Sequence, residues 1–177
     1  TRNASKKILS MFGMYKSSSA IIIDMRNNLG GSGTMIQLLC GIFLKGSKHE
    51  ILQISYKDGR KITLKSDEIP SEFQLTEQPL YLLCSKETYS AAEAFAFILK
   101  NRNRAIIIGE TTAGGGNVAG PHALSNGFVL TIPAGTIVDP VTITGWEHNG
   151  VTPNVAIAPE HALEKAIELI LQKQQAH

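Results

Sequence analysis

Residues 80–99 read LYLLCSKETYSAAEAFAFIL, and they indicate the fold class most directly. Its first part, Leu80 to Cys84, is a continuous apolar run, which is typical of a strand buried on both faces of a sheet. Its last part, Ala91 to Leu99, has the alanine-rich, apolar composition of a packed helix. A buried strand that passes through a short polar loop into a helix favours an α/β fold.

The same alternation of strands and helices continues on both sides of this stretch. Further strands are predicted at 20–24, 105–108 and 128–132, and helices at about 34–44 and 159–174. A hairpin is predicted where Asp58-Gly59 separates the runs 51–56 and 61–64, because Asp-Gly favours the tight turn between antiparallel strands. The pattern predicts an α/β fold with a partly parallel sheet.

Composition indicates one ordered domain over residues 1–177. The chain is 43% hydrophobic and 18% charged, so it can form a core without disulfides or metals. Cys40 and Cys84 stand inside apolar runs, where an unpaired cysteine behaves as a small hydrophobic residue. No Cys/His spacing indicates a metal site.

Charge and hydropathy exclude two classes of partner. The formal net charge is only +2, and Lys and Arg are scattered, which argues against nucleic acid as a partner. No apolar run approaches the ~20 residues of a membrane span, and the N-terminus lacks the pattern of a signal peptide.

Chemistry is expected in the loops that follow the strands, because open α/β sheets bind ligands beyond the carboxyl ends of their parallel strands. In the segment 24–31, the paired glycines Gly30 and Gly31 can bring backbone N–H groups close to a ligand. The segment also fits an ordinary strand-to-helix turn. In the segment 88–93, Ser90 stands at the positive end of a helix, but Ser-x-x-Glu is also a helix-capping box.

Two later segments complete the candidate site. The glycine-rich loop 109–117 lacks the Lys and Ser/Thr of a phosphate-binding loop, so a bound nucleotide is not expected. In the turn-rich segment 145–153, Glu147 and His148 are adjacent, and adjacent side chains usually point apart. We expect His148 to be solvated and Glu147 to be held in place.

Together the four segments resemble the C-terminal processing (tail-specific) serine peptidase family, in its branch near tricorn protease and retinoid-binding proteins. The shared motifs, in family order, are D-x-R-x-N-x-G-G at 24–31, T-x-S-A-x-E at 88–93, G-E-x-T-x-G-G at 109–115 and W-E-x-x-G-V-x-P at 146–153. The resemblance covers residue 19 to the C-terminus. It implies a crotonase-like α/β core with a mostly parallel sheet and flanking helices.

The resemblance also implies the roles of individual residues. Ser90 corresponds to the nucleophile that forms an acyl-enzyme, and the oxyanion hole corresponds to the amides of Ala91 and of Gly30 or Gly31. The implied substrate is a peptide or unfolded protein, and the implied location is outside the cytoplasm. No cofactor or metal is implied, and the oligomeric state is left undecided.

The general base is the point at which this chain departs from the family. Members with a Ser-Lys dyad carry lysine where this chain has Gly115, so a lysine base is not expected. In the tricorn-like branch a late glutamate, matched by Glu147, acts with a histidine and a second serine from an upstream segment. Residues 1–19 contain no histidine, so the domain is expected to be shortened at its N-terminal side and weakly active or inactive by itself.

Two rival interpretations stay open. The missing lysine and histidine also fit a non-catalytic module that binds hydrophobic ligands on the same fold, as retinoid-binding relatives do. Alternatively, His148 or His122 reaches Ser90 and supplies the base within this chain.

Overall fold

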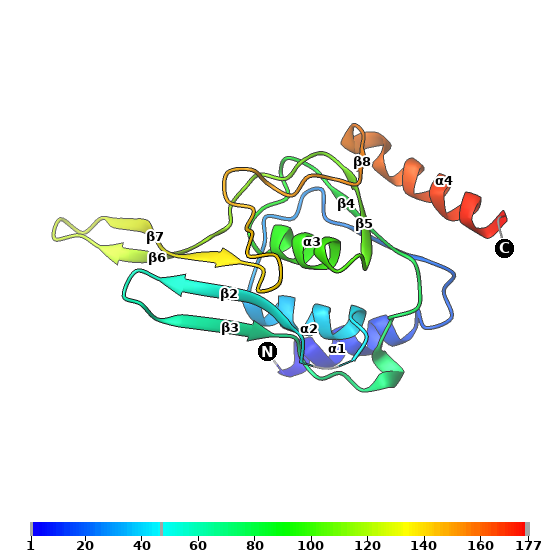
Figure 1. Ribbon diagram of the computed structural model, residues 1–177, viewed down its shortest axis with the longest axis horizontal. Coiled ribbons are helices and arrows are strands. Elements are labelled where there is room, and N and C mark those ends of the chain that lie inside the picture. Colours follow the sequence, from blue (N-terminus) through cyan, green and yellow to red (C-terminus); the bar gives the residue numbers. More distant parts are fainter. Residues whose placement is uncertain (1, 47, 176–177) are drawn as a thin grey trace.

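The computed structural model describes residues 2–46 and 48–175. It contains two four-stranded sheets and the helices that pack on them (Figure 1). Sheet A has the order β1-β4-β5-β8 and sheet B the order β3-β2-β7-β6. Thr1, Ser47, Ala176 and His177 of the expected 1–177 domain lie outside the described residues. Among the described residues, no helix has the length and hydrophobicity needed to cross a bilayer.

Sheet A is parallel and forms the centre of the fold. Its strands are β1 (Ile21–Asp24), β4 (Leu80–Cys84), β5 (Ala105–Gly109) and β8 (Val155–Ala156). Alternate residues of β4 enter two different cores: Leu80, Leu82 and Cys84 join one, and Tyr81 and Leu83 join the other. All five residues are therefore buried, which is why the run is apolar throughout.

Helices cover both faces of sheet A. On one face lie α1 (Arg2–Gly13), α2 (Gly33–Phe43) and α3 (Ala91–Asn101), and the other face carries α4 (Ala162–Gln175) through Ala162 and Ala166. The short 3₁₀ turns η1 (Ser71–Phe73) and η2 (Pro159–His161) complete the helical structure. The α/β fold with a parallel sheet and flanking helices is confirmed, whereas α1 had not been predicted.

Sheet B is antiparallel and projects from the body of the molecule (Figure 1). Its strands are β2 (Glu50–Tyr56), β3 (Lys61–Lys65), β6 (Asn117–Ala123) and β7 (Val129–Val138). The Asp58-Gly59 hairpin forms as predicted, with Gly59 at a φ of +87°. The sequence did not predict β6, because Gly120 and Pro121 interrupt the strand pattern; Pro121 is tolerated because β6 is an edge strand.

One buried ion pair joins sheet B to α3. Arg102 follows α3 and donates to Asp139, after β7, at 2.7 Å and to the Glu50 carbonyl of β2 at 2.7 Å. The Asp139 side chain is fully buried. Burial alone would raise the pKa of Asp139, but the Val141 N–H and the Arg102 guanidinium hold it below its ordinary value.

Candidate active site

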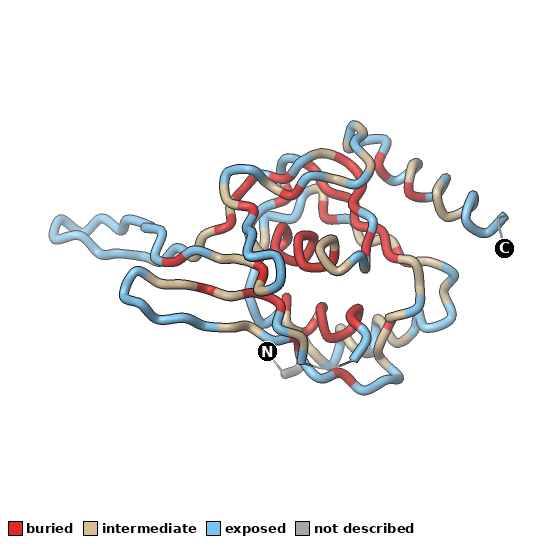
Figure 2. Tube along the Cα trace, in the orientation of Figure 1, coloured by how far each residue is buried: buried red, intermediate tan, exposed pale blue. Residues whose placement is uncertain are grey.

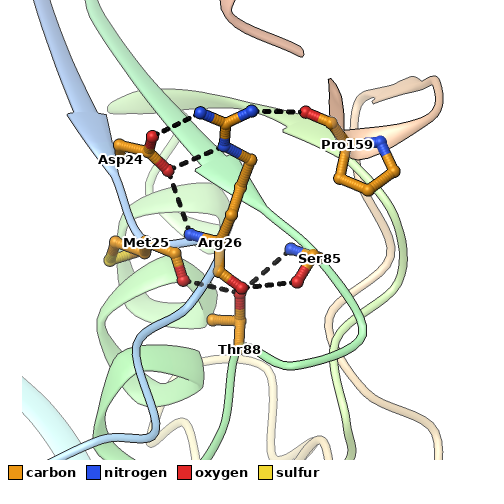
Figure 3. A network of polar contacts seen from close by, with 6 residues as sticks. All are labelled: Asp24, Met25, Arg26, Ser85, Thr88 and Pro159. Carbon is orange, nitrogen blue, oxygen red and sulfur yellow. Dashed lines mark hydrogen bonds and ion pairs between the residues drawn. The ribbon is translucent and has the colours of Figure 1, made fainter. Parts of the chain in front are cut away.

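The loops after β1 and β4 lie side by side, because these strands are parallel neighbours whose carboxyl ends meet at one edge of sheet A. The buried Thr88 hydroxyl donates to the Met25 carbonyl at 2.9 Å and accepts from the Ser85 N–H at 3.0 Å (Figure 3). Ser85 Oγ donates to the Arg26 carbonyl at 2.5 Å. These bonds fix the position of the loop that leads to Ser90.

Asp24 and Arg26 brace the first loop (Figure 3). Arg26 donates to the two Asp24 carboxylate oxygens at 2.9 and 2.6 Å, and its third nitrogen donates to the Pro159 carbonyl at 2.6 Å. The hydrogen bond from Arg26 lowers the pKa of Asp24 below its ordinary value. The D-x-R part of the motif therefore holds the turn to the start of η2.

Ser90 stands at the N-cap of α3 in a strained backbone conformation, with φ 54° and ψ −118°. A positive φ is unusual for a residue with a Cβ and is found at strand-to-helix turns that expose a nucleophile. The Tyr89 N–H donates to the Asn28 carbonyl at 3.0 Å, which brings this turn against the first loop. A Cβ added to Gly30 would lie 3.0 Å from Ser90 Cβ, so only glycine fits there.

Glu93 holds the Ser90 turn in place through hydrogen bonds to its carboxylate. Its fully buried carboxylate accepts from the Ser90 N–H at 2.8 Å and the Thr112 hydroxyl at 2.6 Å. It also accepts from the N–H groups of Gly114 at 2.6 Å and Gly115 at 2.9 Å. Ser90 and Glu93 form the expected capping box, in which the Ser90 N–H donates to the Glu93 carboxylate. This box holds the backbone of the turn at the start of α3.

The backbone N–H groups beside Ser90 are of two kinds: some already donate to an acceptor, and others are open, which means that they have none. The Gly30 N–H donates to Asn28 Oδ1 at 2.9 Å. The N–H groups of Gly31 and Ala91 have no acceptor among residues 2–46 and 48–175. Of the two glycines that the sequence left open, Gly31 is therefore the one with a free donor.

An apolar cleft opens beside Ser90. It has a volume of about 300 Å³ and is lined by Ser90, Ala91 and Gly31 together with side chains of sheet B, α2, α3 and the Trp146 loop. Besides Ala91, its apolar side chains are those of Ile36, Leu52, Ile54, Leu64, Ala94, Val118, Ala119, Ile137 and Trp146. No Asp, Glu, Lys or Arg is among these lining residues.

Glu147 lies against the glycine-rich loop. Its Oε2 accepts from the Gly116 N–H at 2.5 Å, while Oε1 lies 3.8 Å from His148 Nε2. The His148 side chain is 88% exposed, as expected, and His122 lies on β6 opposite Leu130. Within the described part of the chain, no hydrogen bond joins either imidazole to Ser90.

Tyr89 occupies the space beside Gly115, where dyad-type relatives carry lysine. A Cβ added to Gly115 would lie 2.1 Å from Tyr89 Cε2. Neither cysteine offers an alternative nucleophile, because burial raises the thiol pKa of Cys40 and of Cys84 to about 12.

The fold and this site define a class: α/β proteins that present a serine at a helix start beside open backbone amides, an arrangement suited to acyl transfer. The chain belongs to peptidase family S41, whose family model matches residues 1–157. It is 31% identical over 150 residues to the carboxy-terminal processing protease CtpA of Bacillus subtilis (strain 168), covering 83% of this chain and 30% of that protein.

Further comparisons agree with this family. The chain is 30% identical over 148 residues to carboxyl-terminal-processing peptidase 2, chloroplastic, of Arabidopsis thaliana, covering 84% of this chain and 27% of the relative. In fold it resembles the photosystem II D1 C-terminal processing protease, with TM-score 0.74, 23% identity and coverage of 90% and 40%. Tricorn protease also shares the fold, with TM-score 0.58, 20% identity and coverage of 89% and 15%.

The chain thus spans less than a third of the length of the two curated relatives. The structure brings together Ser90, Ala91, Gly30 and Gly31, and places Glu147 on the loop at Gly116. Sequence reasoning gave Glu93 only a capping role and assigned nothing to Asn28. The signal for both was present, since each occupies a fixed position of its motif.

Proposed function

We propose that the protein containing this chain is a serine peptidase that hydrolyses peptide bonds through Ser90. The observation that carries the proposal is the Ser90 hydroxyl at the start of α3, next to the open N–H groups of Gly31 and Ala91. Membership of peptidase family S41 supports it. The hydrophobic-ligand-binding alternative is not favoured, because the matching relatives are named as peptidases.

In the proposed reaction, Ser90 Oγ attacks the peptide carbonyl carbon and gives its proton to a general base. The carbonyl oxygen becomes an oxyanion that accepts hydrogen bonds from the Gly31 and Ala91 N–H groups, each worth about 3 kcal/mol in the transition state. Collapse of the tetrahedral intermediate breaks the C–N bond, and the amine leaves with the proton. Water then hydrolyses the acyl-enzyme by the same steps and restores Ser90.

The base is proposed to be a histidine from a segment upstream of Thr1, oriented by Glu147. Glu147 Oε2 accepts from the Gly116 N–H, whereas Oε1 has no hydrogen-bond donor among the described residues and lies 3.8 Å from His148 Nε2, so Oε1 can accept from an imidazole. A serine without a base ionises poorly near neutral pH. We therefore expect the 177-residue chain by itself to be weakly active or inactive.

The test is cleavage of unstructured peptides by the full-length protein, measured by mass spectrometry. Ser90→Ala should abolish cleavage, and Ser10→Ala, at an exposed position of α1, should leave it unchanged. Equal cleavage by wild type and Ser90→Ala would overturn the assignment.

The natural substrates are proposed to be peptides or unfolded proteins. The site of action is proposed to lie outside the cytoplasm. The second proposal is supported by the family resemblance and by the chloroplastic name of the Arabidopsis relative. Cell fractionation of the native organism with an antibody against this chain would test the location.

A further inference from the structure

Sheet B has one apolar face. Ile54 of β2 pairs with Ile137 of β7 and Ile62 of β3, and Leu52 pairs with Leu64. Cross-strand partners in an antiparallel sheet lie on the same face, so these side chains form one surface. Four of the five, all except Ile62, line the cleft beside Ser90.

The same face continues outward along the β6–β7 hairpin. From Val118, which also lines the cleft, alternate residues of β6 lead through Gly120 and His122. Their partners on β7 are Ile132 and Leu130, and at the tip the Leu124 N–H donates to the Phe128 carbonyl at 2.8 Å. The register shift between Val118 and Ala119 adds one residue to β7 and keeps Ile132 and Leu130 on this face.

The outer half of this face, formed by Phe128, Leu130 and Ile132, is exposed to solvent, and we call it the bare surface. Phe128 is 69% exposed, Leu130 50% and Ile132 40%. Figure 2 shows the projecting ends of β6 and β7 as exposed, in contrast to the buried body of the molecule. Apolar side chains gathered on a projecting surface mark a site of interaction.

The hairpin is also uncharged. Asp139 is the sole Asp, Glu, Lys or Arg between Thr111 and Trp146, and it is buried against Arg102. The hairpin therefore offers no carboxylate, lysine or arginine to a charged ligand; its ionisable side chain on this face is His122, and Lys57 of the β2–β3 hairpin lines a pocket together with Ile132. The chemistry of this surface matches an apolar, uncharged ligand.

We propose that this bare surface holds an uncharged, apolar segment of the substrate polypeptide beyond the residues at the scissile bond. The inference rests on the proposed function, since the occupant is the substrate of the Ser90 site. Continuity with the cleft carries it, because Val118 lines the cleft and begins the row of alternate β6 residues that pairs with Ile132 and Leu130. Leu124 is six positions after Val118, so the surface is about 20 Å long and matches about six residues of extended peptide.

The test measures binding of fluorescent peptides to the 177-residue chain by anisotropy, which needs no general base. An apolar peptide of about 14 residues can reach both the cleft and the hairpin, and one of about six residues at the cleft alone serves as the short control. Leu130→Ser should weaken binding of the long peptide about tenfold, because one apolar contact is lost. Val129→Ser is the matched control, since Val129 is exposed on the opposite face of the same strand.

We expect Leu130→Ser to lose affinity for the long peptide but not for the short one. Wild type should lose a similar amount of affinity when Asp replaces apolar residues in the distal half of the long peptide. Equal binding by wild type and Leu130→Ser would overturn the inference, as would equal losses in Leu130→Ser and Val129→Ser. Sedimentation showing a dimer that Leu130→Ser dissociates would assign the face to a second copy instead. Failure of the proposed function is seen separately, as cleavage that survives Ser90→Ala.

Discussion

Gly30 and Ser90 are in backbone-to-side-chain contact across two loops: a Cβ at position 30 would lie 3.0 Å from Ser90 Cβ and 3.0 Å from the Ala91 nitrogen. Gly30 also has a φ of +102°, which residues with a Cβ rarely adopt. The paired glycines thus have different roles. Gly30 permits close approach of the loops, and Gly31 contributes an open N–H.

Gly30→Ala is expected to destabilise the fold by about 1–3 kcal/mol, because the backbone is strained and the Ala91 backbone cannot move away cheaply. Gly31→Ala is the control, since a Cβ there would meet nothing within 4 Å. Urea denaturation followed by circular dichroism measures both. Equal stability of the two variants would contradict the different roles of the glycines.

Glu93→Ala is expected to cost about 3 kcal/mol or more, because it leaves buried donors from the Ser90 turn and the glycine-rich loop without an acceptor. Glu93→Gln should cost less, since one oxygen is retained. The same denaturation experiment applies, with Glu87→Gln as the control on an exposed site in the same loop. A Glu93→Ala protein as stable as this control would show that the four hydrogen bonds contribute little.

Introducing lysine at position 115 is expected to supply a base to Ser90 only when Tyr89 is removed, because the Tyr89 ring occupies that space. The double variant Gly115→Lys with Tyr89→Ala should react with a fluorophosphonate probe about 10–100-fold faster than Gly115→Met with Tyr89→Ala. The rate should rise with pH as the lysine loses its proton. Equal rates in the Lys and Met variants would exclude lysine as the base.

Acid should weaken the link between Asp139 and Arg102. The folded-state pKa of Asp139 lies below its ordinary value of 3.8, so the stabilisation is complete above that value and is lost as pH falls below it. Asp139→Asn should cost about 3–5 kcal/mol near pH 7, because Arg102 loses its buried partner. Denaturation at a series of pH values should show a smaller acid-induced loss in this variant than in wild type.

Asp58→Asn is the control for this acid effect. Asp58 pairs with Arg60 on the surface, where both side chains are largely exposed. Exposed ion pairs contribute little to stability, so no measurable change is expected. If Asp139→Asn had wild-type stability at every pH, the ion pair between Asp139 and Arg102 would not stabilise the fold.

Local sequence signals were sufficient where a residue's role depends on its neighbours in the chain. The run Leu80–Cys84 predicted a buried strand because both of its faces are covered, and Asp58-Gly59 predicted its hairpin because a tight turn needs those residues. The edge strand β6 was missed because Gly120 and Pro121 weaken the strand pattern, and its pairing with β7 supplies the stability instead.

Residue types alone specified the α/β core and the four loop motifs, because buried strands and turns need particular residue types wherever they occur. Three relations emerged only from the packing of the whole chain: Gly31 rather than Gly30 has an open amide, Glu93 joins two loops, and Tyr89 fills the space beside Gly115. These relations link residues distant in the chain. They depend on the packing of parallel strands side by side, which no local pattern specifies.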